Sequence, residues 1–130
     1  MSKKGNGIET MYEIRFYRDK NGNEPVRKLL EELAARAGKD ARINLNKIND
    51  YMKILMEKGT RAGEPFVKHL ENDIWELRPL SNRILFAAWY DNSFILLHYF
   101  VKKTQKIPRR ELETAKRRYQ DMKERSEDNE

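Results

Sequence analysis

The sequence contains no cysteine and only two histidines, His69 and His98, in 130 residues. Without cysteine the chain has no disulfide, no thiol nucleophile and no cysteine-based zinc site. The two histidines are well separated, so they form no metal-ligand cluster that spacing would reveal. The sequence therefore predicts a protein that works without a metal and without a cofactor.

Long apolar runs are also missing. No stretch approaches the ~18 apolar residues of a membrane-spanning helix, and residues 1–10 lack the apolar stretch of a signal peptide. We therefore expect a cytoplasmic protein without a membrane partner. Its length favours one domain, with a flexible extension over 1–10, the domain over 11–125 and a frayed acidic tail over 126–130.

Positive charge is plentiful and unevenly distributed. The chain has 27 Lys and Arg against 21 Asp and Glu, a net charge of +6. Residues 102–118 hold eight cations and two anions, so this one segment carries a charge equal to that of the whole chain. Such asymmetry favours a basic surface that binds an anionic partner, with nucleic acid first. A solubilising surface with a slight basic excess is the alternative.

Two helices are predicted in the first half. Asn23 is a plausible N-cap before Pro25, and Gly38 is the expected stop of this first helix. Asp40 can cap a second helix that ends at Gly59, and the short link between them implies an antiparallel pair. Apolar residues recur at spacings of three and four in both helices, as a core-facing stripe requires: Val26, Leu29, Leu30, Leu33, Ala34 and Ala37, then Ala41, Leu45, Ile48, Met52 and Leu55.

Strand patterns surround these helices. Residues 12–17 alternate between apolar and charged, 66–70 is a possible short strand, and 74–77, 84–90 and 94–101 are rich in β-favouring residues. A last helix begins near Pro108 and packs through Leu112, Ala115, Tyr119 and Met122. The predicted fold is α+β, of β-α-α-β-β-β(-α) order, with two N-terminal helices on a mainly antiparallel twisted sheet and a C-terminal helix.

A two-residue turn at Asp91-Asn92 fixes a register for the last hairpin. It pairs Trp89 with Phe94, Leu85 with His98 and Arg83 with Phe100, while the preceding loop pairs Glu76 with Leu85 and Arg78 with Arg83. Because side chains alternate, one face then carries Glu76, Arg78, Arg83, Leu85, Trp89, Phe94, His98, Phe100 and Lys102. The opposite, nearly apolar face carries Trp75, Leu77, Ile84, Phe86, Ala88, Tyr90, Ile95, Leu97, Tyr99 and Val101, and is predicted to cover the two N-terminal helices.

Cations beside aromatic rings at one end of a sheet suit RNA. Cations meet phosphates, and rings such as Tyr99 and Phe100 stack on unpaired bases. If the site also cleaves RNA, the ribose 2′-OH attacks its own phosphate, Arg and Lys stabilise the developing charge, and a His or Lys moves the proton. Glu76 is a conceivable base.

Structural alternatives stand beside these assignments. His98 could be a hydrogen-bonded strand histidine, and Arg78 could pair with Glu76 or with an acidic loop residue. Arg83 and the Lys102-Lys103 pair are the stronger candidates, because both flank the same end of the hairpin.

Three motifs carry a resemblance to a known family. They are W-E-L-R-P at 75–79, R-I-L-F at 83–86 and L-H-Y-F-V-K-K-T-Q-K-I-P at 97–108, with M-Y-E-I-R-F-Y at 11–17 as an opening. Over residues 11–118 the chain resembles phage-derived HigB-like toxins of the RelE/ParE superfamily. The resemblance implies a type II toxin that cleaves mRNA on the translating ribosome without metal, and a helix-turn-helix antitoxin as partner.

The same resemblance assigns site residues. Arg83 matches the strand arginine of the family, Lys102 or Lys103 its basic residue after the last strand, and Arg78 the arginine of the E-L-R motif. Ile74 and Glu76 replace a lysine pair, and Arg109 stands near the position of a terminal tyrosine, so the proton-transfer groups stay open. The predicted catalytic residues are Arg78, Arg83, His98, Lys102 and Lys103; the predicted RNA-binding residues are Lys68, His69, Tyr99, Phe100, Lys106, Arg109 and Arg110.

Two other functions fit the same residues. One is a ParE-like toxin that inhibits DNA gyrase without chemistry of its own, since one fold serves several functions. The other is a non-catalytic relative that binds nucleic acid or protein.

Overall fold

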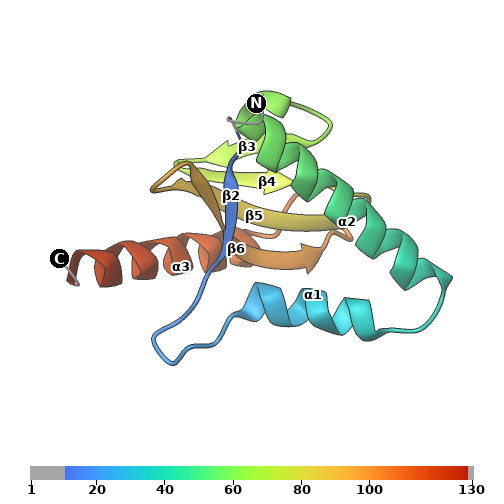
Figure 1. The fold of residues 1–130 in the computed structure, drawn as a ribbon, viewed down its shortest axis with the longest axis horizontal. Helices are drawn as coiled ribbons and strands as arrows, with labels where there is room; N and C mark the ends of the chain where they lie inside the picture. Colours follow the sequence, from blue (N-terminus) through green and yellow to red (C-terminus); the bar gives the residue numbers. More distant parts are fainter. Residues whose placement is uncertain (1–10, 129–130) are drawn as a thin grey trace, which may run out of the picture.

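A computed structural model describes residues 11–128 of the chain. The chain forms a five-stranded sheet, in the strand order β2-β6-β5-β4-β3, and three α-helices, arranged as Figure 1 shows. The elements are β2 (Glu13–Phe16), α1 (Pro25–Ala35), α2 (Lys39–Lys58), a 3-10 turn η2 (Gly59–Ala62), β3 (Val67–Glu71), β4 (Ile74–Leu77), β5 (Asn82–Trp89), β6 (Ser93–Val101) and α3 (Arg109–Asp128). The α+β class is confirmed, and the possible short strand at 66–70 is present as β3, which adds a strand to the predicted order.

The sheet is mixed. β3, β4, β5 and β6 pair antiparallel in succession, as predicted, but β2 pairs with β6 in the parallel sense. Glu13 lies opposite Ser93 and Phe16 opposite Leu96. A parallel partner needs a long crossover, and here α1, α2 and the three strands after them supply it.

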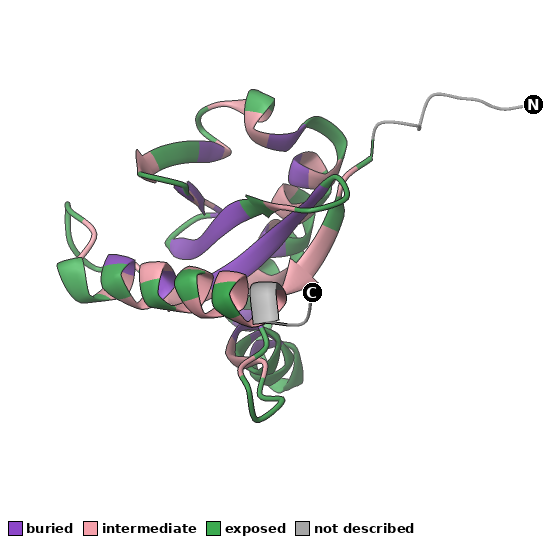
Figure 2. Ribbon diagram, turned by 90° about the vertical axis from the view of Figure 1, so that its left-hand side faces the viewer, coloured by how far each residue is buried: buried purple, intermediate pink, exposed green. Residues whose placement is uncertain are grey.

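Helices cover both faces of the sheet, and each face has its own core. On one face α1 and α2 contribute Val26, Leu30, Ile48 and Leu55 to a cluster with Phe86 of β5. The core of the other face is made by α3 with the strands and contains Leu85, Ala87, Ile95, Leu97, Leu112 and Ala115. Figure 2 shows that the buried residues concentrate in the strands, while the helices are mostly half-buried or exposed.

The predicted stripe of α2 is confirmed, that of α1 is confirmed for half of its residues, and the predicted caps are partly wrong. All five stripe residues of α2 are buried or half-buried. In α1 only Val26, Leu30 and Leu33 are buried, whereas Leu29 and Ala34 are exposed and Ala37 lies beyond the end of the helix. Asn23 does not cap α1, because its side chain and backbone amide bond to Asp19 instead. α1 ends at Ala35, and the N-cap of α2 is Gly38 rather than Asp40, which lies in the first turn of that helix. Gly59 ends α2 as predicted, and Figure 1 shows α1 and α2 diverging from their link rather than lying side by side.

The register of the last hairpin is half right. Three predicted pairs are present: Leu85 with His98, Arg83 with Phe100, and Glu76 with Leu85. Nearer the turn, Trp89 pairs with Ser93 instead of Phe94. Asp91 and Asn92 do adopt positive φ values of 58° and 52°, but Tyr90 joins them in the turn.

A β-bulge in β6 brings the strand pairing back to the predicted register farther from the turn. Leu85 opposes His98 while Phe86 opposes Leu96, so Leu97 is the extra residue of β6. Three face assignments were therefore wrong: Ile95 and Leu97 lie in the core under α3, and Phe94 lies in the core under α1 and α2. An alternating pattern cannot reveal such an insertion, since each side of the bulge alternates correctly by itself.

The C-terminal helix begins at Arg109, directly after Pro108, and all four predicted packing residues contact the sheet core. Of the predicted tail 126–130, residues 126–128 form the last turn of α3. The predicted extension over 1–10 lies outside the described residues. No helix within residues 11–128 is both long and apolar enough to cross a membrane.

Candidate RNA-binding site at the strand ends

Three strand ends meet at one edge of the molecule. β4 ends at Leu77, β5 begins at Asn82 and β6 ends at Val101, so the loops beyond them lie together. The backbone amide of Lys102 donates to the carbonyl of Ser81 across 2.8 Å and ties these loops to each other. A hollow of about 530 Å³ opens here, lined by Leu80, Ser81, Arg83, Lys102, Lys103, Thr104 and Gln105.

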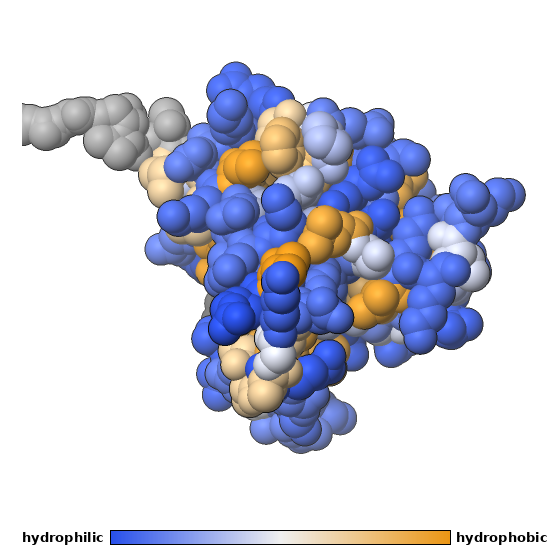
Figure 3. All heavy atoms as spheres, turned by 90° about the vertical axis from the view of Figure 1, so that its right-hand side faces the viewer, coloured by the Kyte–Doolittle hydropathy of each residue, from blue (hydrophilic) through white to orange (hydrophobic). Residues whose placement is uncertain are grey.

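The surface around the hollow is mainly hydrophilic. Figure 3 looks onto this side of the molecule and shows small apolar patches within a hydrophilic surface. Leu80 and Val101 are large apolar residues of this end that stay exposed. Arg83, Lys102 and Lys103 thus give the hollow three cations and no anion among its lining residues. Such a hollow suits a phosphate group beside an apolar or aromatic moiety.

Arg83 is held rigidly. Its side chain is only 10% exposed, and Nη1 donates to the carbonyls of Leu80 at 2.7 Å and Asn82 at 2.8 Å. Nε lies 3.7 Å from Oε2 of Glu76. Among residues 11–128, Nη2 has no hydrogen-bond partner, so this amino group is the part of Arg83 left for a ligand. Burial lowers the pKa of Arg83 from its ordinary 12.5.

Arg78 is bound on both sides by carboxylates. Its Nε lies 3.3 Å from Oε1 of Glu76, and its Nη1 donates to Oε1 of Glu64 across 3.1 Å. Glu64 is the acidic residue of the loop before β3. The structural alternative for Arg78, pairing with Glu76 or an acidic loop residue, is thus realised with both partners.

Glu76 lies at the centre of these cations. Its side chain is 2% exposed, and burial raises its pKa, against the opposing effect of Arg83, Arg78, Lys102 and Lys68. Lys68 is placed there by register, because it pairs with Glu76 across β3 and β4. Four cations therefore surround one buried carboxylate at the edge of the hollow.

His98 lies under α3, not in the hollow. Its Nε2 is 2.6 Å from Oε1 of Glu111, and its Nδ1 is 3.3 Å from Nη1 of Arg118. Burial lowers the pKa of His98, and Glu111 opposes that effect. Phe100 stacks on the imidazole with ring centres 5.6 Å apart. These contacts match the structural alternative for His98, a hydrogen-bonded strand histidine.

The other predicted RNA-binding residues are dispersed. Tyr99 lies on the opposite face, where its hydroxyl donates to Oδ1 of Asn82 across 2.6 Å. His69 packs edge-on against Trp75, and Nε2 lies 2.7 Å from the carbonyl of Asn72. Arg109 donates through both amino groups to Glu71. Lys106 and Arg110 are exposed, in the loop before α3 and in its first turn.

Sequence reasoning missed the position of Glu76 as a link between two arginines. The signal was present: a single carboxylate stands in the apolar strand I-W-E-L, two residues before one arginine and seven before the other. A charge in a buried strand requires a paired charge. Only the register across β4 and β5 shows which cations supply it.

Part of the chain matches a known protein family. Residues 38–120 match the family described as phage derived protein Gp49-like (DUF891). The match covers more than half of the chain and includes every strand end around the hollow. The chain belongs to this family.

The Gp49-like family is a RelE/HigB-like toxin family of toxin–antitoxin systems, and membership implies an antitoxin partner. The resemblance drawn from the W-E-L-R-P and F-V-K-K-T-Q-K-I-P motifs is confirmed at this level. No curated protein matches the chain. Among residues 11–128, no group of three His, Asp or Glu side chains is arranged to hold a metal ion.

Proposed function

We propose that this Gp49-like protein is a type II toxin that cleaves mRNA on the translating ribosome and thereby inhibits translation in the cytoplasm. The observation that carries the proposal is the hollow at the strand ends, where Arg83, Lys102 and Lys103 converge. A RelE/HigB-like toxin needs a site for an RNA phosphate, and this hollow has the charge and the position for one.

The reaction that suits these groups is transfer within the RNA itself. The ribose 2′-oxygen attacks the adjacent phosphorus, the bond from phosphorus to the 5′-oxygen breaks, and a 2′,3′-cyclic phosphate and a 5′-hydroxyl are formed. Negative charge grows on the phosphoryl oxygens in the transition state. Nη2 of Arg83 and the ammonium groups of Lys102 and Lys103 stabilise that charge.

We assign proton transfer to side chains that are accessible from the hollow. The 2′-hydroxyl proton leaves to a base or to water, and the 5′-oxygen takes a proton from an acid. Lys102 and Lys103 face the hollow and are the candidate donors. Glu111 and Arg118 engage both ring nitrogens of His98, so His98 would act only after α3 moves.

The proposed partners follow from the same function. An antitoxin neutralises the toxin in the cell, and we expect a small helix-turn-helix protein encoded next to it. The ribosome supplies the mRNA in an extended, unpaired form, whose phosphates and bases are accessible to a shallow site.

The test is induction of the toxin without its antitoxin, followed by 5′-end mapping of cellular mRNA. We expect growth arrest and new 5′ ends within coding regions. The double variant Arg83→Ala, Lys102→Ala should lose both effects. The matched control is Lys28→Ala, Lys53→Ala, which removes the same charge from exposed positions on α1 and α2 outside the hollow lining.

Two outcomes would contradict the proposal. If the Arg83/Lys102 variant still cleaved mRNA, the hollow would not be the site. If induction gave a DNA-damage response with intact mRNA, the protein would act as a gyrase-inhibiting toxin of the ParE kind.

A further inference from the structure

The carboxylate of Glu76 occupies an unusual place in β4. The strand is otherwise apolar, with Ile74 and Leu77 fully buried in two different cores. Glu76 is buried to the same degree but points at two guanidinium groups. A glutamate is almost never fully buried unless it is paired, so its contacts decide what it does.

Each oxygen of Glu76 faces a different arginine. Oε1 lies 3.3 Å from Nε of Arg78, and Oε2 lies 3.7 Å from Nε of Arg83. Within residues 11–128, Oε2 of Glu76 and the Nε atoms of both arginines are buried without a hydrogen bond. Buried polar groups are nearly always hydrogen-bonded. Three such atoms in one cluster therefore indicate a group of charges kept for a purpose other than stability.

Electrostatics explains why a carboxylate is needed there. Arg78 and Arg83 would repel each other if they shared a buried site alone, and Lys68 and Lys102 add to the positive potential. Glu76 lowers the charge of its arginine pair from two to one, which matches the single negative charge of a phosphodiester. Its Oε2 also faces Nε of Arg83 at 3.7 Å, while two carbonyls accept hydrogen bonds from Nη1.

We propose that Glu76 is a positioning residue: its carboxylate holds the guanidinium groups of Arg78 and Arg83 so that Nη2 of Arg83 meets an RNA phosphate in the hollow. The inference rests on the proposed function for the identity of that phosphate. Glu76 itself does not take the 2′-hydroxyl proton, because its carboxylate is enclosed by the two arginines and is not among the residues that line the hollow.

The positioning role is tested first without RNA cleavage. NMR signals of arginine Nε–Hε groups report the surroundings of Arg78 and Arg83 directly. In Glu76→Gln we expect both signals to shift and the Arg83 Nε–Hε proton to exchange faster with water. The matched control is Glu64→Gln, the same chemical change in the exposed partner of Arg78, which should leave the Arg83 signal in place.

Titration with inorganic phosphate extends this test. Phosphate should shift the Arg83 signal in the wild-type protein and in Glu64→Gln, and should shift it less in Glu76→Gln. An Arg83 signal that is identical in wild type and Glu76→Gln, with or without phosphate, would overturn the inference.

The second test separates binding from cleavage. Glu76→Gln removes one negative charge, so it should bind a short single-stranded RNA at least as tightly as the wild type, while mRNA cleavage after induction falls at least tenfold. A loss confined to cleavage indicates positioning, whereas a merely structural residue would weaken both. Unchanged cleavage in Glu76→Gln would contradict the proposal.

Two further arms keep the result interpretable. If Glu76→Gln does not fold, Glu76→Asp keeps the charge and withdraws it by one methylene; we expect intermediate Arg83 shifts and intermediate cleavage, and wild-type cleavage would count against the role. If the wild-type toxin cleaves no mRNA, the proposed function fails, but the arginine signals still decide whether Glu76 positions Arg83.

Discussion

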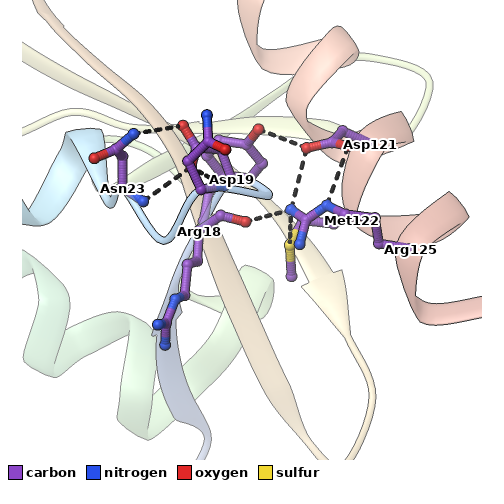
Figure 4. A network of polar contacts seen from close by, with 8 residues as sticks. Arg18, Asp19, Asn23, Asp121, Met122 and Arg125 are labelled. Atoms are coloured by element: carbon purple, nitrogen blue, oxygen red, sulfur yellow. Dashed lines mark hydrogen bonds and ion pairs between the residues drawn. The ribbon is translucent and has the colours of Figure 1, made fainter. Parts of the chain in front are cut away.

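The phenolic hydroxyl of Tyr17 donates a 2.6 Å hydrogen bond to Oδ2 of Asp121, although 104 residues separate them in sequence. The bond joins the end of β2 to the middle of α3. Figure 4 shows the neighbouring contacts. Arg125 donates hydrogen bonds to Asp121 and to the carbonyl of Arg18. Asp19, the residue after Arg18, accepts a hydrogen bond from the backbone amide of Asn23. This network fixes α3 on the sheet, beside the core that it covers.

Removing the hydroxyl should loosen this attachment. We expect Tyr17→Phe to lower the free energy of unfolding by about 1–2 kcal/mol, the range of a hydrogen bond to a charged group. Chemical denaturation of Tyr17→Phe, Asp121→Asn and the double variant measures the coupling between them. A double variant whose loss equals the sum of the single losses would show that the bond contributes nothing.

The same hydrogen bond should make the stability of the fold depend on pH in the alkaline range. Burial, together with Asp121, raises the pKa of Tyr17 from 10.0 to about 12. Because the folded state keeps this proton longer than the unfolded state, the stability from Tyr17 is complete below pH 10 and is lost as pH rises towards 12. Absorbance titration of tyrosinate should show one late group, and Tyr17→Phe should remove it.

Gly59 and Gly63 have similar backbone conformations, so substitutions at the two positions can be compared directly. Their φ and ψ values are 64° and −153°, and 69° and −176°, a region that side chains rarely adopt. A Cβ at Gly59 would come within 2.9 Å of the Tyr12 ring, whereas at Gly63 the nearest atom is 4.0 Å away. We expect Gly59→Ala to cost about 1–3 kcal/mol more than Gly63→Ala. Thermal and denaturant unfolding measure both, and equal losses would show that Tyr12 moves aside without cost.

His98 should make stability depend on mild acid. Burial under α3 lowers its pKa from 6.5, so the native state favours the neutral ring and the unfolded state takes up the proton first. The free energy of unfolding should therefore fall as pH drops below 6.5. Glu76, whose pKa burial raises, adds a slope of opposite sign to the wild type and to the variants alike.

The difference between wild type and His98→Gln isolates this effect. We expect the downward slope between about pH 7 and pH 5 to disappear in His98→Gln and to persist in His69→Gln, which lies away from α3's contact with β6. The measurement is denaturant unfolding at several pH values. An unchanged slope in His98→Gln would mean that the ring does not lose its proton on folding.

The hollow and the α3 surface can be separated by salt dependence. Lys103 lines the hollow, while Arg109 already pairs with Glu71 through two hydrogen bonds. For a short single-stranded RNA, each phosphate contact contributes about −0.7 to the slope of log affinity against log salt. We expect Lys103→Ala to reduce the slope by about that amount and Arg109→Ala to change it little. Fluorescence anisotropy over a salt series measures both, and a larger effect from Arg109→Ala would place the RNA on α3 instead.

Local patterns in the sequence were sufficient for much of the fold. Spacings of three and four predicted the buried stripe of α2, a proline predicted the start of α3, and Gly59 ended a helix as expected. The same patterns predicted that Arg83 and Lys102 share the end of a hairpin. These features depend on residues close in sequence, whose backbone geometry leaves few alternatives.

The tertiary structure decided the rest. The bulge at Leu97, the parallel pairing of β2 with β6 and the enclosure of His98 by Glu111 each depend on residues that only folding brings together. The hollow shows the division most clearly. The sequence by itself determined a cation-rich strand end and the family to which it belongs, but the pairing of β4 with β5 decided that Glu76 lies between Arg78 and Arg83. A buried charge is stable only beside its counter-charge, and that neighbour is set by register across strands rather than by order along the chain.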